Sequence, residues 1–318
     1  MTKTFNKKEI PIVFAVDDNY APFLCVSIRS IMENASADRF YRIYVLNTGI
    51  SEKNQKLLLK SAEGFRGNGS LEFVDVADRM ESLSGKLRLR DYYTNAIFYR
   101  IFIPSLFPNY EKILYLDSDI VFNDDVAKLF DTDLTGCVLG VTKDEIVPAI
   151  AGFAEYVEDF LGVDKHEYFN SGLLLFNTEE YKKTQTEKKF IEYMLKYKFE
   201  IAPDQDCLNV LLQGRIKYID PCWNKTPMPE LISDVNELKA IHFKMKFRPW
   251  KYDDVLCQDI FWKYAKATPY YKDLIKMRKK TTEQDKKNDE TGFIALIKMA
   301  RELIDSENNF LRLQSENA

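Results

Sequence analysis

Short apolar runs alternate with longer amphipathic stretches along the first half of the chain. Runs of four to six apolar residues bounded by polar ones are typical of buried strands, and longer stretches with apolar side chains at helical spacing are typical of helices. Alternating strands and helices form βαβ units, which predicts an α/β fold with a mostly parallel sheet covered on both faces. The expected strands are residues 11–16, 41–46, 71–76 and 113–116, and the expected helices are residues 20–34, 51–63 and 91–103.

The second half of the chain is less regular. Residues 173–176 are all apolar and predict another buried strand, and residues 240–243 predict a short strand with His242 near its end. A helix is expected over residues 207–213, after Pro203 and the polar sequence Asp-Gln-Asp.

Residues 266–318 differ in character from the rest. Residues 276–288 are polar and rich in lysine, which indicates a linker or a solvated helix. From Phe293 to Ile304, apolar side chains recur at helical spacing. Such a helix either packs on the preceding domain or a second subunit, which we favour, or lies on a membrane or partner with the nearby lysines attracted to anionic lipid.

Acidic side chains follow two of the expected strands. Asp17 comes after the first, and Asp117-Ser118-Asp119 comes after the strand at 113–116. Residues two apart in a strand point the same way, so Asp117 and Asp119 are expected to converge. Two adjacent carboxylates repel unless a hard divalent cation lies between them. The alternative is a turn or helix cap that carries two aspartates. Ligands of parallel sheets bind at the carboxyl ends of the strands, which favours a binding site.

Composition and charge narrow the functional classes. The 318 residues are 46% hydrophobic, enough for one large or two modest domains, and the net charge of −4 argues against nucleic acid as the main partner. The five cysteines lack CxxC spacing, which suits a reducing cytoplasm rather than disulfides or a zinc site. The apolar run at residues 10–16 ends at Asp17-Asp18 without a cleavage pattern, so we interpret it as a strand and expect a cytoplasmic protein.

Six short motifs occur along the chain in a characteristic order and spacing. They are residues 14–21 (FAVDDNYA), 44–51 (YVLNTGIS), 116–120 (LDSDI), 168–172 (YFNSG), 204–206 (DQD) and His242 with Arg248-Pro249-Trp250. Together they closely resemble glycosyltransferase family 8, which includes lipopolysaccharide galactosyltransferases and glycogenin. The resemblance covers roughly residues 10–265, with residues 266–318 as a charged helical extension.

The resemblance implies a GT-A fold, an αβα sandwich that transfers a hexose from a UDP-sugar with retention of anomeric configuration. It implies UDP-glucose or UDP-galactose as donor and a saccharide or glycolipid acceptor, in cell-surface polysaccharide or lipopolysaccharide synthesis. Ala15, Asp17, Asn19 and Tyr20 would form the uridine pocket, in which Tyr20 can stack on uracil and Asp17 can accept from its N–H. Asp17 can equally form an Asx turn that ends the strand.

The resemblance also implies a metal site. Asp117 and Asp119 look like the metal ligands of the family, His242 resembles the third ligand, and Ser118 lies between the two carboxylates in the donor site. An imidazole beside two carboxylates favours Mn²⁺, with Mg²⁺ as the alternative. The other histidine, His166, has no such support.

The phosphate-binding stretch of the family usually reads His-x-x-Gly-x-x-Lys-Pro-Trp. Here Arg248 replaces the lysine and can still grip a phosphate. Met245 replaces the glycine, which puts the close approach of the backbone to a phosphate in doubt. Lys244 and Lys246 add positive charge that can compensate.

The remaining family positions concern the sugar. Asn170, Asp204 and Gln205 resemble donor-sugar contacts, Arg100 matches a position that contacts the donor, and Asp144 matches one near the sugars. Gln205 would lie nearest the anomeric carbon, with Asp204 beside it. An amide is a poor nucleophile, so Gln205 is expected to stabilise an oxocarbenium-like state while the acceptor attacks from the leaving-group side.

Two other functions stay open at this point. A non-catalytic UDP-sugar-binding protein is favoured only by Met245, and a sugar nucleotidyltransferase is disfavoured because residues 15–21 contain neither glycine nor lysine. The acceptor is expected to bind variable loops, for which the candidates are residues 79–95, 145–167 and 222–238.

Overall fold

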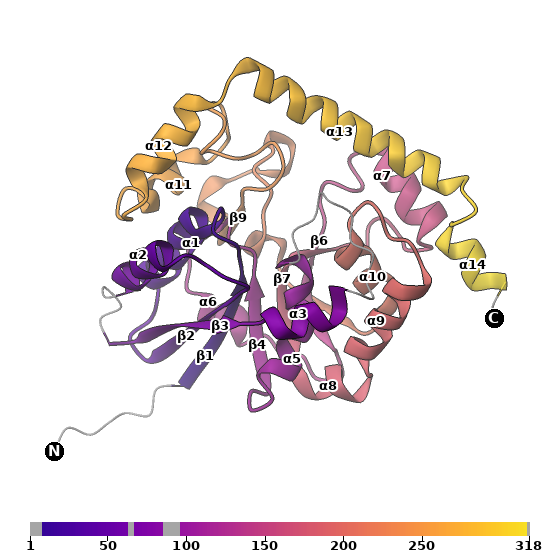
Figure 1. Ribbon diagram of the computed structural model, residues 1–318, viewed down its shortest axis with the longest axis horizontal. Helices are drawn as coiled ribbons and strands as arrows, with labels where there is room; N and C mark the ends of the chain where they lie inside the picture. Colours follow the sequence, from indigo (N-terminus) through magenta and orange to yellow (C-terminus); the bar gives the residue numbers. More distant parts are fainter. Residues whose placement is uncertain (1–7, 63–66, 85–95, 317–318) are drawn as a thin grey trace.

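A seven-stranded mixed sheet forms the centre of the protein (Figure 1). The computed structural model describes residues 8–62, 67–84 and 96–316. The strand order is β3-β2-β1-β4-β7-β6-β8. The strands are β1 (Lys8–Ala15), β2 (Arg39–Asn47), β3 (Gly69–Asp75), β4 (Lys112–Leu116), β6 (Leu139–Lys143), β7 (Phe169–Asn177) and β8 (Ile216–Tyr218).

The four strands expected in the first half pair in parallel, which confirms that part of the prediction. Strand β7 runs antiparallel to both of its neighbours, β4 and β6. A continuous apolar strand such as β7 shows burial on both faces but not direction, so its reversal could not be foreseen. The fold is therefore α/β with a mostly parallel sheet.

Helices cover both faces of the sheet, so alternate side chains of a strand enter different hydrophobic cores. Ile12 and Phe14 of β1 pack with α1, α2 and α11, whereas Val13 packs with α4, α9 and α10 on the other face. The helices up to residue 265 are α1 (Ala21–Glu33), α2 (Glu52–Ala62), α3 (Ala77–Ser84), α4 (Ala96–Tyr99), α5 (Ile103–Leu106), α6 (Val126–Phe130), α7 (Ala151–Glu155), α8 (Thr178–Lys183), α9 (Thr186–Lys196), α10 (Pro203–Leu211) and α11 (Gln258–Ala265).

The helix expected over residues 91–103 is only partly described. Residues 91–95 lie outside the described part of the chain. Beyond them, α4 is followed by a 3₁₀ turn at Arg100–Phe102 and then by α5, which begins next to Pro104. Proline is tolerated in the first turn of a helix and not in its interior, so Pro104 separates the two helical segments.

A second, two-stranded sheet joins distant parts of the sequence. Strands β5 (Ile120–Phe122) and β9 (Ala240–His242) pair antiparallel, with Ile120 opposite His242. The backbone N–H of Phe243 donates to the carbonyl of Asp119 at 3.0 Å. This register brings the histidine next to the Asp-x-Asp sequence.

The C-terminal segment is helical from residue 271, including most of the stretch for which we considered a linker. It forms α12 (Tyr271–Lys280), α13 (Glu283–Ile304) and α14 (Phe310–Glu316). Helix α13 begins at a capping box between Thr282 and Asp285 and runs from α12 to α7 across the molecule (Figure 1).

The apolar stripe of α13 packs on the preceding part of the chain, at α7, which is the alternative favoured above. The Phe293 ring meets that of Phe153 edge-on at 5.8 Å, and Ala300 and Leu303 are buried. In the described part of the chain, none of the helices is both long and apolar enough to span a bilayer.

Candidate functional site

Three ligand-type side chains converge where β4, β5 and β9 meet. Carboxylate oxygens of Asp117 and Asp119 and a ring nitrogen of His242 all lie within 4.8 Å of one another. His242 Nε2 lies 3.1 Å from Asp119 Oδ1 and 3.8 Å from Asp117 Oδ2. The two carboxylates converge through a turn, in which the N–H of Ile120 donates to the Asp117 carbonyl, rather than through strand alternation. The convergence was predicted correctly, and the turn considered as its alternative is present as well.

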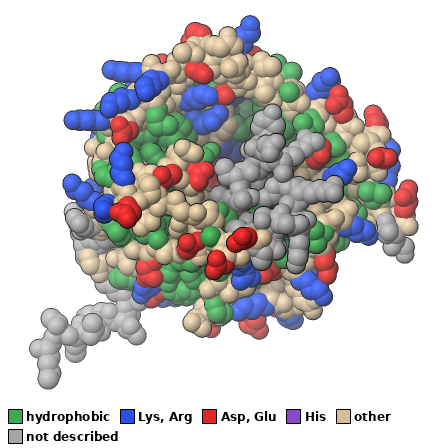
Figure 2. All heavy atoms as spheres, viewed as in Figure 1, with side chains coloured by type: hydrophobic (Ala, Val, Ile, Leu, Met, Phe, Trp, Pro, Cys, Tyr) green, Lys and Arg blue, Asp and Glu red, His purple; other side chains and the backbone are tan. Residues whose placement is uncertain are grey.

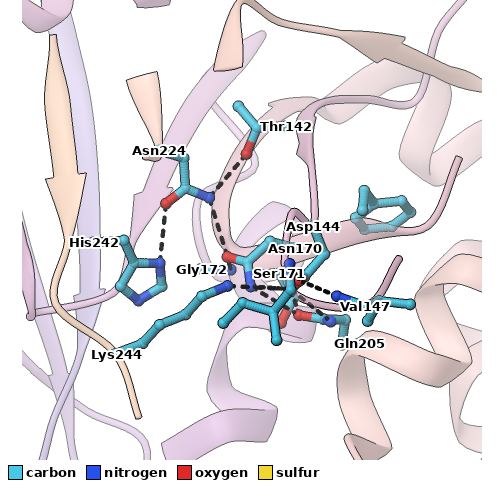
Figure 3. Close-up of polar contacts among 12 residues, drawn as sticks. Thr142, Asp144, Val147, Asn170, Ser171, Gly172, Gln205, Asn224, His242 and Lys244 are labelled. Carbon is cyan, nitrogen blue, oxygen red and sulfur yellow. Dashed lines mark hydrogen bonds and ion pairs between the residues drawn. The ribbon is translucent and has the colours of Figure 1, made fainter. Parts of the chain in front are cut away.

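The tautomer of His242 is set by Asn224. The Asn224 amide nitrogen donates to Thr142 Oγ1 and Asn170 Oδ1, so its oxygen faces the imidazole (Figure 3). That oxygen lies 2.9 Å from His242 Nδ1, which must then carry the proton. The lone pair of Nε2 is left facing the two aspartates, which is the orientation that a metal-binding histidine needs.

Gly172 of β7 leaves room for this cluster. A Cβ at this position would lie 2.5 Å from His242 Cε1 and 2.7 Å from Asp117 Oδ2. The glycine is therefore a steric requirement of the close approach between β7 and the ligand side chains.

A partly buried hydrogen bond and an ion pair hold the Asp117 carboxylate in place. The Tyr115 hydroxyl donates to Asp117 Oδ1 at 2.6 Å, and Arg100 Nη2 lies 3.1 Å from the same atom. Arg100 also donates to the carbonyl of Ser171 and lies 3.4 Å from Asp204. Burial raises the pKa of Asp204, and the charge of Arg100 opposes that shift. Arg100 thus links Asp117 to the start of α10.

The side chains predicted to contact the sugar form one hydrogen-bonded group (Figure 3). Gln205 Oε1 accepts from the Asn170 amide at 3.1 Å and from the backbone N–H of Ser171 at 2.9 Å. Asp144 accepts from Asn170 and from Lys244, each at 3.1 Å. Burial would raise the pKa of Asp144, but Lys244 and these hydrogen bonds lower it overall.

A cavity of about 210 Å³ opens beside this group. Asp144, Asn170 and Gln205 line it together with Met245, and Leu296 of α13 contributes to its wall. Polar and apolar walls in one cavity suit a sugar ring, which presents hydroxyls at its edge and C–H groups on its faces.

Asp206 lies beside the cavity and is buried. It accepts hydrogen bonds from the hydroxyls of Tyr156 and Tyr168 and from the N–H of Ala202. Burial raises the pKa of Asp206 to about 7, even though these hydrogen bonds act in the opposite direction.

The predicted uridine residues follow β1. Asp17 Oδ1 accepts from the backbone N–H groups of Asn19 and Tyr20, so the Asx turn is present. Tyr20 is 42% exposed and its ring contacts Phe23 edge-on. Partial burial and the nearby charge of Asp119 raise the pKa of Tyr20 to about 12.

The basic loop after β9 lies at the edge of the same region. Met245 has a φ of 55°, a left-handed conformation that glycine adopts freely and methionine does not. The chain thus keeps the backbone conformation that the glycine of the family pattern suits. Arg248 lies 3.3 Å from Asp289 of α13, and Trp250 stacks on Phe23 with 4.1 Å between ring centroids.

Sequence reasoning missed several contributors to the site. Asn224 comes from an irregular segment without a motif, and Gly172 was recognised only as part of one. Lys244 was expected to add charge at the phosphates but pairs with Asp144. His166 is exposed and lies outside the metal-type cluster. All five cysteines are free.

Comparison with known proteins finds similar glycosyltransferases. A "Putative glycosyltransferase" of Haemophilus influenzae is 29% identical over 217 residues, which are 68% of this chain and 63% of that protein. An Escherichia coli lipopolysaccharide 1,2-glucosyltransferase is 29% identical over 220 residues, 67% of this chain and 61% of its own length. The alignments thus span under two thirds of these relatives. The solved galactosyltransferase LgtC with donor and acceptor sugar analogues is 28% identical, with a TM-score of 0.66 over 82% of this chain and 96% of its own.

The residues fit a divalent cation well. Two carboxylates and one imidazole whose tautomer is fixed by a hydrogen bond form a donor set suited to Mn²⁺ or Mg²⁺. The glycine beneath them and the partly buried hydrogen bond to Asp117 hold the set together. Residues 11–254 match the family described as Glycosyl transferase family 8, and the chain belongs to this family, with a GT-A fold.

Proposed function

We propose that the protein is a metal-dependent retaining hexosyltransferase that uses UDP-glucose or UDP-galactose. The observation that carries the proposal is the convergence of Asp117, Asp119 and His242 beside the group formed by Asn170 and Gln205. One cluster suits a cation that binds a diphosphate, and the neighbouring group suits a sugar. A nucleotide-sugar that spans both is the simplest ligand for such a pair.

In this proposal Asp117, Asp119 and His242 hold Mn²⁺, with Mg²⁺ as the alternative. A cation held by these residues would supply Lewis-acid stabilisation of the departing UDP. Asn224 and Tyr115 keep the ligands oriented through their hydrogen bonds to His242 and Asp117. Tyr20 and Asp17 recognise the uracil, Ala15, Asn19 and Ser118 complete the nucleotide site, and Arg248 contributes a cation at the diphosphate.

The transfer breaks the bond between the anomeric carbon and the β-phosphate oxygen. The acceptor hydroxyl forms the new bond from the same face, and its proton passes to the departing phosphate oxygen. Gln205 stabilises the positive charge that develops on the sugar, because its carbonyl oxygen is fixed by two hydrogen bonds. Asp204, Arg100 and Asp144 orient the neighbouring groups.

The acceptor in this proposal is a saccharide or glycolipid of a cell-surface glycan. The cavity beside Gln205 supports a sugar acceptor, since both polar and apolar side chains line it. This assignment draws on the lipopolysaccharide glucosyltransferase among the relatives and is independent of the metal site.

We also propose that the enzyme works in the cytoplasm and contacts a membrane peripherally. The apolar stripe of α13 is used in packing, so such a contact would involve other groups. Figure 2 shows Lys and Arg side chains gathered over α12, and Ile294 and Leu311 are 59% and 44% exposed. Co-sedimentation with vesicles of anionic or neutral lipid tests this, and equal recovery with both would contradict it.

The main test is UDP release from separate UDP-sugars with Mn²⁺, Mg²⁺ or EDTA. We expect slow hydrolysis of UDP-glucose or UDP-galactose that EDTA and Asp119→Asn both abolish. Asp124→Asn is the matched control, because Asp124 pairs with Lys128 at 2.6 Å outside the cluster. Binding of UDP without UDP release from any donor, in the presence or absence of acceptors, would favour a non-catalytic UDP-sugar-binding protein. A requirement for a nucleoside triphosphate would favour a nucleotidyltransferase.

A further inference from the structure

A carboxylate from the C-terminal extension contacts the basic loop of the proposed donor site. Asp289 of α13 lies 2.6 Å from Lys251 Nζ and 3.3 Å from Arg248 Nη2, and it accepts a hydrogen bond from the Tyr252 hydroxyl. All three contacts are made by one oxygen, Oδ2. Lys251 and Arg248 lower the pKa of Asp289 even though burial would raise it, so this side chain is an anion near neutral pH.

Asp289 lies outside the family match, which ends at residue 254. Its position is nevertheless well defined. The capping box at Thr282 fixes the start of α13, and the contact between Phe293 and Phe153 fixes the next turns on the domain. The carboxylate is therefore held against the loop by the packing of the helix on both sides.

Arg248 is only weakly held by this contact. An ideal pair between a guanidinium and a carboxylate has two parallel hydrogen bonds near 2.8 Å, whereas Arg248 makes a single contact of 3.3 Å with Asp289. Its Nε is buried and finds no hydrogen-bond partner among the described residues. The guanidinium thus retains donor groups that an anion with more oxygens, such as a diphosphate, can use.

The loop backbone does not depend on Asp289. Trp250 stacks on Phe23, Phe243 is buried in the core, and the N–H groups of Lys251 and Tyr252 donate to the carbonyl of Arg248. Removing the carboxylate should therefore change the charge at Arg248 and Lys251 more than the position of their backbone.

We propose that Asp289 competes with the donor diphosphate for Arg248 and Lys251, so that the C-terminal extension sets the affinity for the nucleotide. This inference rests on the proposed function, which assigns Arg248 to the diphosphate. The carboxylate neutralises one of the two positive charges that Arg248 and Lys251 carry. A diphosphate that binds Arg248 must weaken this ion pair, and the cost of doing so reduces the observed affinity.

Substitution of Asp289 therefore strengthens nucleotide binding. Asp289→Asn keeps the size of the side chain and removes its charge. We expect UDP to bind about threefold more tightly, which is the size of effect typical of a partly exposed ion pair. The gain should shrink at high salt because surface charges are screened.

The test is calorimetric titration of UDP with Mn²⁺ into the full chain. Asp289→Glu keeps the charge and should bind UDP like the wild type. Glu290→Gln removes the same charge one residue along, from an exposed side chain, and is the matched control. Tighter binding by Asp289→Asn alone among these variants supports the inference.

Equal or weaker binding of UDP by a folded Asp289→Asn protein refutes the inference and leaves the proposed function intact. If Asp289→Asn does not fold, Asp289→Ser provides a second uncharged variant. Failure of both to fold makes Asp289 a structural residue and also refutes the inference. Absence of UDP binding by the wild type refutes the proposed donor site itself, which makes the two failures distinguishable.

Discussion

Substitution of Gly172 by alanine tests the cluster of Asp117, Asp119 and His242 through sterics alone. The added Cβ would lie 2.5 Å from His242 Cε1, 2.7 Å from Asp117 Oδ2 and 2.9 Å from Asn170 Oδ1. All three separations are below the 3.0 Å that real Cβ atoms keep. None of the three neighbours can move freely, because His242 is bonded to Asn224 and Asp117 to Tyr115.

The effect of this methyl group on the free energy of unfolding can be estimated. Overpacking a well-packed interior costs about 1–3 kcal/mol, so the free energy of unfolding should fall by that amount. The His242 and Asp117 side chains must each move away from the added methyl group by several tenths of an ångström. Disturbing the support of metal ligands typically weakens binding about 10–100-fold. We expect the Mn²⁺ concentration for half-maximal activity to rise by a similar factor.

The assay is UDP release from the active donor as a function of Mn²⁺ concentration, with urea unfolding measured in parallel. Gly292→Ala is the matched control, because a Cβ on Gly292 of α13 has no neighbour within 4 Å. That variant should be more stable by up to about 1 kcal/mol and keep the wild-type Mn²⁺ response. A Gly172→Ala protein with an unchanged Mn²⁺ response would show that Asp117 and His242 do not share a metal.

Three further outcomes follow from the site. In the UDP-release assay, Asn224→Ala should raise the half-saturating Mn²⁺ concentration about 10–100-fold, because His242 loses the acceptor that fixes its tautomer. An unchanged Mn²⁺ concentration would contradict this. Met245→Gly should raise the free energy of unfolding in urea by about 1 kcal/mol, since glycine relieves the left-handed backbone, and a loss of stability would count against strain there. Burial raises the pKa of Asp206 from 3.8 to about 7, so the stability that its protonated form contributes is complete below about pH 4 and is lost as the pH rises through about 7. Asp206→Asn should reduce the change of the melting temperature with pH between these values. An unchanged pH dependence would disprove the shift.

Much of the fold could be predicted from local pattern. Apolar patterns of strand length identified β1, β2, β3 and β4. Burial on both faces gives β1 and β4 a continuous apolar signature, whereas β2 and the edge strand β3 are only partly buried and their apolar residues are interrupted by polar ones. The expected helix over residues 51–63 is also present as α2, and Ser51 Oγ before its first residue accepts from the N–H of Asn54. These features depend on neighbours in the sequence, which is why sequence alone reveals them.

The remaining features depend on contacts between distant residues. The reversal of β7 leaves no trace in its composition. Asp117 and Asp119 could be paired with His242 only through the family pattern, because the β5–β9 pairing that joins them involves two very short strands. Asn224 and Asp289 lie in segments whose polar composition is ordinary for a surface. Their roles become apparent only from their contacts with His242 and Arg248 in the folded protein.

The most direct measurement is a calorimetric titration of UDP into the wild-type protein with Mn²⁺ or with EDTA. If Asp117, Asp119 and His242 hold a cation that binds the diphosphate, UDP should bind with Mn²⁺ and lose most of its affinity in EDTA, and Asp119→Asn should remove the difference. UDP binding of equal strength under both conditions would contradict the proposed metal-dependent donor site.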